Sequence, residues 1–351
     1  MSAALVIAGG VPAGPRPPLY GDLRRWALVQ ADAVTLLAQL PDASVDAIVT
    51  DPPYGLNFDN QAWDGGTLAD GLGFQVFSRV WAEQARRVLR PGGYLVSFGA
   101  PRTVHRLVAG VEDADFEIRD GLLWLFGSGM PKSRRMPGGL GSALKPAYEP
   151  ILLARAPLDP ATPRLLDNLA AHGTGALNIR AARLVDQPYR DPATGELVGR
   201  WPANLLLGHD AGCGGEGCTE GCVVAEIDRQ YPSARPSRYF YCGKATTGER
   251  DAGLQELPKA GAGVFSASGT AARANIHPTV KPLGLMRWLI RLVVPPGGVV
   301  LDPFSGSGST GCAAVLEGRQ FIGVEREAAY LPIARARMAH WAQVARSGRA
   351  A

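Results

Sequence analysis

Short apolar runs alternate with stretches of helical periodicity along two separate parts of the chain. In the first part, apolar runs predict strands at 26–32, 45–50, 94–99 and 121–127. Between them, apolar residues at helical spacing predict helices at 33–41, 74–93 and 103–114, the second ended by a Pro-Gly-Gly sequence. Strands that alternate with helices are typical of a mostly parallel α/β sheet with helices on both faces.

The alternation stops after residue 127 and returns near residue 276. Helices are predicted at 282–298, 310–318 and 328–346, with strands at 299–304 and 319–327. The intervening chain is rich in Gly, Pro, Arg and Ser, with strand-like runs at 148–156 and 237–245. We therefore expect five segments: a disordered tail at 1–18, a first half-domain at 19–127, an inserted α+β region at 128–275, a second half-domain at 276–345 and a tail at 346–351.

Composition narrows the class of protein. The 351 residues carry five cysteines, too few for a secreted fold built on disulfides. No apolar run approaches the roughly 18 residues of a membrane span, and the first 18 residues lack the basic start of a signal peptide. We expect a soluble cytoplasmic protein without a membrane partner. The net charge of +4 mildly favours a polyanionic partner.

A candidate site follows the predicted strand at 45–50. Asp51, Pro52, Pro53 and Tyr54 come directly after it, and proline ends a central strand because it cannot donate a ladder hydrogen bond. A carboxylate, stiff backbone carbonyls and an aromatic ring are therefore expected at the carboxyl end of a sheet. The alternative is an ordinary turn after a strand.

A glycine-rich turn follows the predicted strand at 299–304. Gly306, Gly308 and Gly311 fit the pattern G-x-G-x-x-G, and Glu325 closes the next strand at the position of a ribose-binding acid. This pattern predicts a nucleoside cofactor, and the lack of a lysine after the glycines argues against a nucleoside triphosphate. The alternative is a tight strand-to-helix turn without a ligand.

Taken together, the two stretches resemble the motifs of S-adenosylmethionine-dependent DNA amino-methyltransferases. The Asp-Pro-Pro-Tyr motif precedes Asp302-Pro303-Phe304 and its glycines in the chain, which resembles the circularly permuted β group of adenine-N6 and cytosine-N4 methyltransferases. The resemblance covers residues 20–130 and 275–345. It implies a Rossmann-like methyltransferase sheet and a target-recognition segment in the inserted region.

The resemblance also implies catalytic roles. Asp51 and Pro52 would accept hydrogen bonds from the exocyclic amine of the target base, which frees the nitrogen lone pair for in-line attack on the methyl group. The rigidity of Pro52 and Pro53 would keep the acceptors in place. Tyr54 would stack on the base, which must leave the duplex to reach it.

Cofactor roles carry over in the same way. The loop that would wrap the methionine part contains Asp302, Pro303, Phe304, Gly306 and Gly308. Glu325 would bind the ribose, and Asp32 would bind the adenine amine or cap the following helix. Thr279 and Lys281 would help to hold the methionine carboxylate.

Several alternatives remain at this stage. An aspartate before Pro-Pro-Tyr is more usual for adenine, which favours adenine-N6 over cytosine-N4. Methylation of RNA or of a protein amide is disfavoured, because an asparagine is more usual there. A further alternative is a nicotinamide-dependent oxidoreductase, which leaves Asp-Pro-Pro-Tyr and the basic insertion unexplained. The last is a non-catalytic DNA-binding module, which would bind DNA without binding the cofactor.

The inserted region predicts contact with double-stranded DNA. Its cations and aromatic residues could reach phosphates and base edges, or could simply form a solvated surface: Lys132, Arg134, Arg135, Arg183, Arg200, Trp201, Arg235, Arg238, Tyr239, Tyr241 and Lys244. The sequence is compatible with a homodimer. It identifies neither a recognition sequence nor a partner endonuclease, although a role in restriction-modification fits the resemblance.

A cysteine-rich loop lies within the same region. His209, Cys213, Cys218 and Cys222 provide four soft ligands that could hold a structural zinc ion. Their spacing differs from the common C-x2-C signature, and free or occasionally oxidised thiols are the alternative.

Overall fold

The structure is a computed structural model of the 351-residue chain. It describes residues 19–20, 25–57, 62–126, 137–144, 146–191, 194–208, 213, 218–220, 222–230, 240–241, 244–259 and 274–348. The predicted tail at 1–18 lies outside the described residues.

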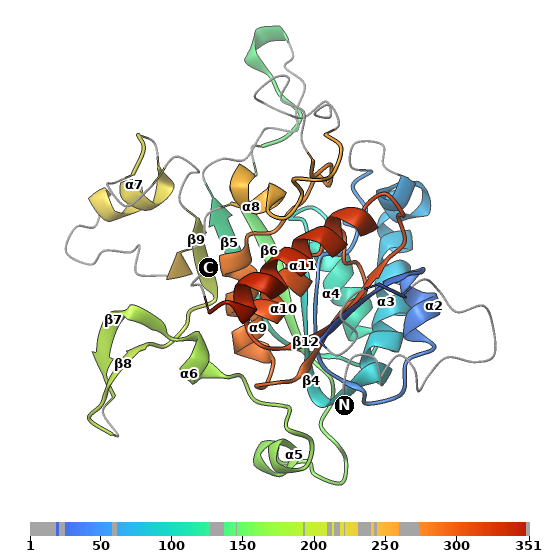
Figure 1. Cartoon of the computed structure of the whole chain (residues 1–351), viewed down its shortest axis with the longest axis vertical. Coiled ribbons are helices and arrows are strands. Elements are labelled where there is room, and N and C mark those ends of the chain that lie inside the picture. Colours follow the sequence, from blue (N-terminus) through green and yellow to red (C-terminus); the bar gives the residue numbers. More distant parts are fainter. Residues whose placement is uncertain are drawn as a thin grey trace.

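A ten-stranded sheet forms the centre of the described molecule (Figure 1). Its strands, in spatial order, are β1 (Leu19–Tyr20), β2 (Trp26–Gln30), β12 (Gln320–Glu325), β11 (Val299–Asp302), β3 (Val45–Thr50), β4 (Leu89–Phe98), β6 (Tyr148–Arg155), β5 (Glu117–Phe126), β9 (Leu205–Gly208) and β10 (Phe240–Tyr241). Among the described residues, β1 and β6 run antiparallel to their neighbours, and the other neighbouring pairs are parallel. The mostly parallel α/β sheet predicted from the sequence is confirmed.

Helices cover both faces of the sheet. The helices α9 (Leu283–Val293), α10 (Ser309–Leu316) and α11 (Leu331–Arg346) share one apolar core with inward residues of β2, β3 and β4. The helices α2 (Ala33–Leu37), α3 (Gly71–Val88) and α4 (Val104–Glu112) share the other. Neighbouring residues of one strand enter opposite cores, as Ala27 and Leu28 do, which explains why these strands are apolar throughout.

Smaller elements surround this sandwich. They are the 3-10 turns η2 (Ala62–Asp64), η3 (Gly66–Ala69) and η4 (Pro137–Gly139), the helices α5 (Leu165–His172), α6 (Ile179–Ala182), α7 (Val223–Gln230) and α8 (Thr247–Asp251), and a two-stranded sheet of β7 (Leu184–Arg190) and β8 (Leu197–Arg200). In Figure 1 the pair β7–β8 and the helix α7 project from the body.

The end of α3 differs from the prediction. We expected the helix to run to the Pro-Gly-Gly sequence, whereas it ends at Val88 and the chain is already in β4 from Leu89. Val45 pairs with Leu89 but Ala47 pairs with Tyr94, so residues 90–93 bulge out of the ladder. The Pro-Gly-Gly sequence therefore lies in a strand bulge and does not end the helix.

The predicted insert at 128–275 contains part of the main sheet. Its first strand-like run, β6, lies between β4 and β5 with antiparallel pairing on both sides. Its strands β9 and β10 extend the same sheet. The insert is thus not wholly separate from the α/β domain, and its exact boundaries stay a prediction.

Among the described residues, the structure has no helix that is both long and apolar enough to cross a membrane.

Candidate active site

The carboxyl ends of β3 and β11 meet at one edge of the sheet. The two strands are parallel, with Leu301 opposite Ile48. Thr50 Oγ1, at the end of β3, donates a hydrogen bond to Asp302 Oδ1 at 2.7 Å. The Asp-Pro-Pro-Tyr motif and the Asp302 loop, some 250 residues apart in the chain, therefore lie side by side.

The turn after Tyr54 is held on two sides. Asp64 is buried, and its carboxylate accepts hydrogen bonds from the backbone N–H groups of Gly55 at 2.7 Å and Leu56 at 3.1 Å. Gly55 has a φ of +66°, and a Cβ there would come within 2.5 Å of a backbone carbonyl in η3, so only glycine fits. Thr103 Oγ1 donates to the carbonyl oxygen of Tyr54 at 2.7 Å. Residues 51–54 are thereby fixed in position.

Lys281, which is distant from the Asp-Pro-Pro-Tyr motif in the sequence, lies beside it in the structure. Lys281 Nζ lies 2.8 Å from Asp51 Oδ2 and 3.0 Å from Glu149 Oε2. It also donates to Tyr54 Oη at 3.1 Å, while that hydroxyl donates to Asp51 Oδ1 at 2.6 Å. The sequence predicted that Lys281 helps to hold a methionine carboxylate. In the structure, the ammonium group of Lys281 contacts the carboxylates of Asp51 and Glu149. The predicted contact with a methionine carboxylate stays untested.

Burial controls the charges of this cluster. It raises the pKa of Asp51, and the nearby Lys281 opposes that rise. For Lys281, burial acts to lower the pKa, but Asp51 and Glu149 outweigh it and the pKa is raised. Burial also raises the pKa of Tyr54 well above its ordinary value, and the nearby carboxylates of Asp51 and Glu149 raise it further. The cluster therefore holds a charged lysine beside a neutral tyrosine hydroxyl.

The predicted cofactor loop begins at the buried Asp302. Its Oδ1 also accepts from the backbone N–H of Phe304 at 3.1 Å. Pro303 is buried, and the half-buried ring of Phe304 packs on Trp81 of α3 with centroids 5.7 Å apart. Gly308 takes a left-handed conformation, with a φ of +77°, directly before α10. The loop therefore leads from β11 into the amino end of a helix.

Glu325 lies at the end of β12, beside this loop. Its carboxylate accepts the backbone N–H of Gly306 at 2.7 Å and that of Glu327 at 2.7 Å. Burial raises the pKa of Glu325 to about 7 and the pKa of Asp302 to about 6. Two buried carboxyl groups with raised pKa values suit a ligand that brings cationic or hydroxyl groups.

His277 encloses the loop from the opposite side. A Cβ on Gly306 would lie 2.5 Å from His277 Nε2, so this position requires glycine. The backbone N–H of the half-buried Thr279 donates to His277 Nδ1 at 3.3 Å, which places the ring proton on Nε2. Burial, with the nearby Lys281, lowers the pKa of His277 to about 3 and keeps it neutral. Thr279 thus lies near the loop and contacts His277 through its backbone N–H.

Asp32 caps α2. Its Oδ1 accepts hydrogen bonds from the backbone N–H of Thr35 at 3.1 Å and from Thr35 Oγ1 at 3.2 Å. The capping role considered from the sequence is confirmed. The side chain is exposed after β2, next to the end of β12, where Ala31 N–H donates to the Glu325 carbonyl. A role in binding the adenine amine stays a prediction.

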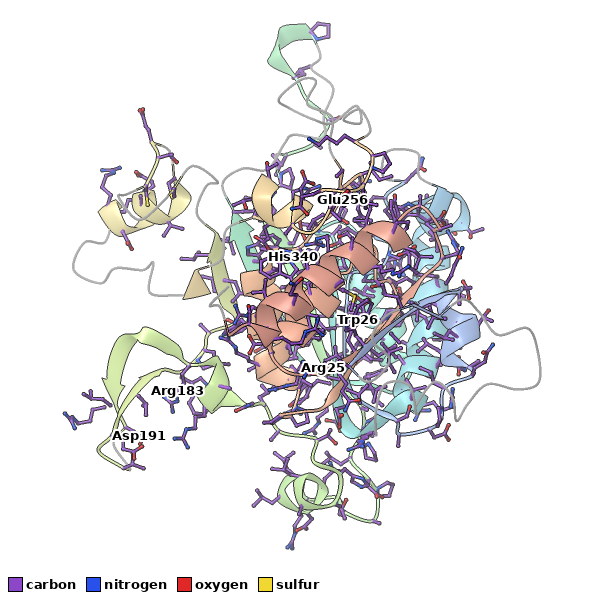
Figure 2. All side chains as sticks on the ribbon, in the orientation of Figure 1. Arg25, Trp26, Arg183, Asp191, Glu256 and His340 are labelled. Carbon is purple, nitrogen blue, oxygen red and sulfur yellow. The ribbon has the colours of Figure 1, made fainter. Side chains whose placement is uncertain are left out.

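The inserted region is described only in part. The residues Lys132, Arg134, Arg135, His209, Arg235, Arg238, Tyr239 and Cys242 lie outside the described residues. Arg183 lies over the exposed ring of Trp201, 5.5 Å from its centroid, and Figure 2 shows it with Asp191 near the projecting β7–β8 pair. Lys244 lies 3.7 Å from the ring centroid of Phe126. Cys213, Cys218 and Cys222 come together, with their sulfur atoms within 4.8 Å of one another.

Among the site residues that sequence reasoning did not single out are two carboxylates, Glu149 and Asp64. Both are single carboxylates without a surrounding motif, and they reach the site only through tertiary structure. Glu149 lies in β6, whose antiparallel place in the sheet is not readable from its apolar pattern. The one available signal was its place near the start of an apolar run.

Comparison with known proteins identifies the family of this chain. The model of a family described as DNA methylase matches residues 45–336. The type II methyltransferase M.HindIII of Haemophilus influenzae is 22% identical over 349 aligned residues, covering 85% of this chain and 90% of that protein. The type II methyltransferase M.HinfI of the same species is 20% identical over 325 residues, covering 89% and 67%. The solved structure of PvuII DNA methyltransferase, described as cytosine-N4-specific, shares the fold with a TM-score of 0.54 at 15% identity, over 93% of this chain and 94% of that one.

Proposed function

Since the chain belongs to the DNA methylase family, we propose that it transfers a methyl group from S-adenosylmethionine to the N6 amine of adenine in double-stranded DNA. The observation that carries this proposal is the cluster at the end of β3. There, Asp51 is held by Tyr54 and Lys281, next to the Asp302 loop. An acceptor for an amine thus lies directly beside a candidate cofactor site.

The residues around the loop fit S-adenosylmethionine. When bound, this cofactor supplies a methyl group activated by a positively charged sulfur. Asp302 and Glu325 are buried, and the described residues provide no salt-bridge partner for either. Hydroxyl groups of a ribose and the cationic groups of the methionine part would compensate these carboxyl groups. We propose that Asp302, Phe304 and the glycine loop hold the methionine part, that Glu325 holds the ribose, and that Asp32 reads the adenine.

Asp51 can accept a substrate hydrogen bond in addition to the two that it has. An ionised carboxylate offers about four lone-pair positions, of which Tyr54 and Lys281 use one on each oxygen. The exocyclic amine of adenine is a poor nucleophile because its lone pair is delocalised into the ring. Hydrogen bonds to Asp51 and to the Pro52 carbonyl would draw the nitrogen towards tetrahedral geometry and free the lone pair for attack. The displaced amine proton then goes to solvent.

The choice of adenine rests on Asp51, because an aspartate at this position is the form more usual for adenine targets. Cytosine-N4 is the second candidate and needs the same acceptors. In either case the target base must leave the helix stack to bring its amine to Asp51, so we propose base flipping. Tyr54 would then stack on the flipped base.

Methylation mapping tests the proposal. The chain and its Asp51→Ala variant are expressed in a host without adenine methylation, and the genomic DNA is sequenced by a method that reports modified bases. We expect N6-methyladenine within one sequence motif, absent with the variant. N4-methylcytosine would overturn the choice of base and keep the chemistry. A lack of any modified base, despite binding of S-adenosylmethionine, would overturn DNA as the substrate of this chain acting alone.

Two substitutions separate the roles of Tyr54. Tyr54→Phe removes the hydrogen bond to Asp51 and keeps the ring, so we expect kcat to fall roughly tenfold, as for the loss of about 1–2 kcal/mol of hydrogen bonding. Tyr54→Ala also removes the stacking surface, worth about 1–3 kcal/mol per base, so we expect a further rise in KM for DNA. Steady-state kinetics on an oligonucleotide with the mapped motif measure both. Equal KM values for the two variants would contradict the stacking role.

Cofactor binding should depend on pH through Glu325. Burial raises its pKa to about 7, and ribose hydroxyls donate hydrogen bonds to the ionised form. Binding of the cofactor therefore requires that Glu325 loses its carboxyl proton. The affinity for S-adenosylhomocysteine should fall by up to about tenfold per pH unit below pH 7 and level off above it. Isothermal titration calorimetry measures this affinity as a function of pH. Titrations between about pH 5.5 and 8.5 span the pKa of Glu325 by about 1.5 units on each side.

Glu325→Gln provides the control for this profile. The variant cannot ionise, so we expect weaker binding that no longer rises towards pH 7. A wild-type slope that persists in Glu325→Gln would assign the pH dependence to another group.

A further inference from the structure

Three cysteines from the inserted region form a compact cluster beside the sheet. The sulfur atoms of Cys213, Cys218 and Cys222 all lie within 4.8 Å of one another. The structure places no disulfide between these three cysteines. They are graded in exposure, with Cys222 buried, Cys213 half-buried and Cys218 exposed. A disulfide would use only two of the three, so their mutual approach points to a shared partner.

We propose that these three cysteines bind a structural zinc ion as thiolates. Zinc takes thiolate ligands at about 2.3 Å in tetrahedral geometry, which places ligand sulfurs about 3.8 Å apart. The three sulfurs are close enough to reach that spacing through small side-chain movements. The sequence prediction added His209, which lies outside the described residues, and the proposal rests on the three cysteines alone.

The surroundings of Cys213 fit a metal-bound thiolate. The backbone N–H of Thr219 donates to its sulfur at 3.4 Å, and Thr219 Oγ1 lies 3.4 Å from the same atom. Donors to the sulfur stabilise negative charge on a thiolate and orient it towards the metal. Thr219 follows directly on Cys218, so the same short turn positions two of the three ligands.

The zinc ion would fasten α7 to the edge of the main sheet. Cys222 directly precedes α7 and packs with Val224 and with Leu207 of β9 in a small apolar cluster. This cluster has three buried residues and four half-buried ones packed against it, which is a small apolar contact for a helix. A metal that joins Cys222 to Cys213 and Cys218 provides a further link, as α7 projects from the body (Figure 1).

Metal analysis of the whole chain tests the inference. The protein is purified without a histidine tag or chelator, and its zinc is measured by mass spectrometry. We expect about one zinc ion per chain, lost in Cys218→Ser and retained in the matched control Cys312→Ala, whose cysteine lies buried in α10. Binding of S-adenosylhomocysteine should be unchanged in Cys218→Ser, which shows that the variant is folded.

Cobalt substitution gives a second test that needs no variant. Exchange of the bound metal for Co²⁺ should produce the intense thiolate-to-cobalt absorption and visible bands of a tetrahedral site, together with faster proteolysis near α7 in the metal-free form. The proposal is overturned by zinc-free protein whose three thiols react at once with a thiol reagent. It is equally overturned by a disulfide between any two of them in protein purified without reductant.

Discussion

Asp51→Ala should lower kcat for DNA methylation by about 10²–10³-fold, the effect of removing one preorganised electrostatic group from an active site. The carboxylate is the side-chain acceptor in the proposed mechanism, held by Tyr54 at 2.6 Å and Lys281 at 2.8 Å. Its loss leaves the target amine conjugated with its ring. The cofactor loop has its own contacts, so the affinity for S-adenosylhomocysteine should change little.

Single-turnover kinetics and calorimetry measure the two effects separately. Asp70→Ala is the matched control, because Asp70 is an exposed aspartate before α3 whose side chain makes no capping hydrogen bond. A variant that loses activity and cofactor affinity together would contradict a role confined to the amine. Retention of more than about a tenth of the wild-type kcat would contradict a preorganised acceptor.

Lys281→Met should destabilise the fold by about 3–5 kcal/mol, the cost of breaking a buried ion pair by removing one partner. The lysine side chain is 6% exposed and lies between Asp51 and Glu149. Without it, two half-buried carboxylates face each other. The pKa of Asp51, which burial already raises, loses the opposing effect of Lys281, so the surviving activity should need a higher pH than in the wild type.

Urea unfolding at neutral pH measures the free energy of unfolding. The double variant Glu149→Gln with Lys281→Met removes one of the two carboxylates and should recover part of the loss. Lys259→Met, at an exposed position, is the matched control and should lie within about 0.5 kcal/mol of the wild type. A Lys281→Met variant as stable as the control would show that Lys281 is not needed to balance the charges of Asp51 and Glu149.

The parts of the site that depend on local sequence were predictable. The stop after β3 follows from two consecutive prolines, and the loop after β11 follows from glycines at positions where a Cβ would clash, as at Gly306. The strand-helix alternation in the two halves of the α/β domain is also confirmed, since each apolar period depends only on neighbouring residues.

Lys281 and Glu149, which form one cluster with Asp51, are distant from it in the sequence, so the sequence alone did not predict this cluster. Lys281 was assigned to the cofactor on the resemblance, and that role stays a prediction. The structure also brings Lys281 to Asp51 and Glu149, which lie far from it in the sequence. Glu149 was not singled out, because nothing in an apolar run shows that it pairs antiparallel between β4 and β5. A strand bulge at residues 90–93 likewise replaced the expected helix stop.

The strand order has a consequence for biosynthesis. The strands β11 and β12 lie between β2 and β3, so the centre of the sheet is completed by segments made some 250 residues after β3. Until Val299 and the following residues emerge, β2 and β3 each lack a partner on an inner edge. Unpaired edges and contacts between distant segments favour slow folding and aggregation. Nascent chains of this protein should therefore expose these strand edges to chaperones until β11 and β12 have left the ribosome.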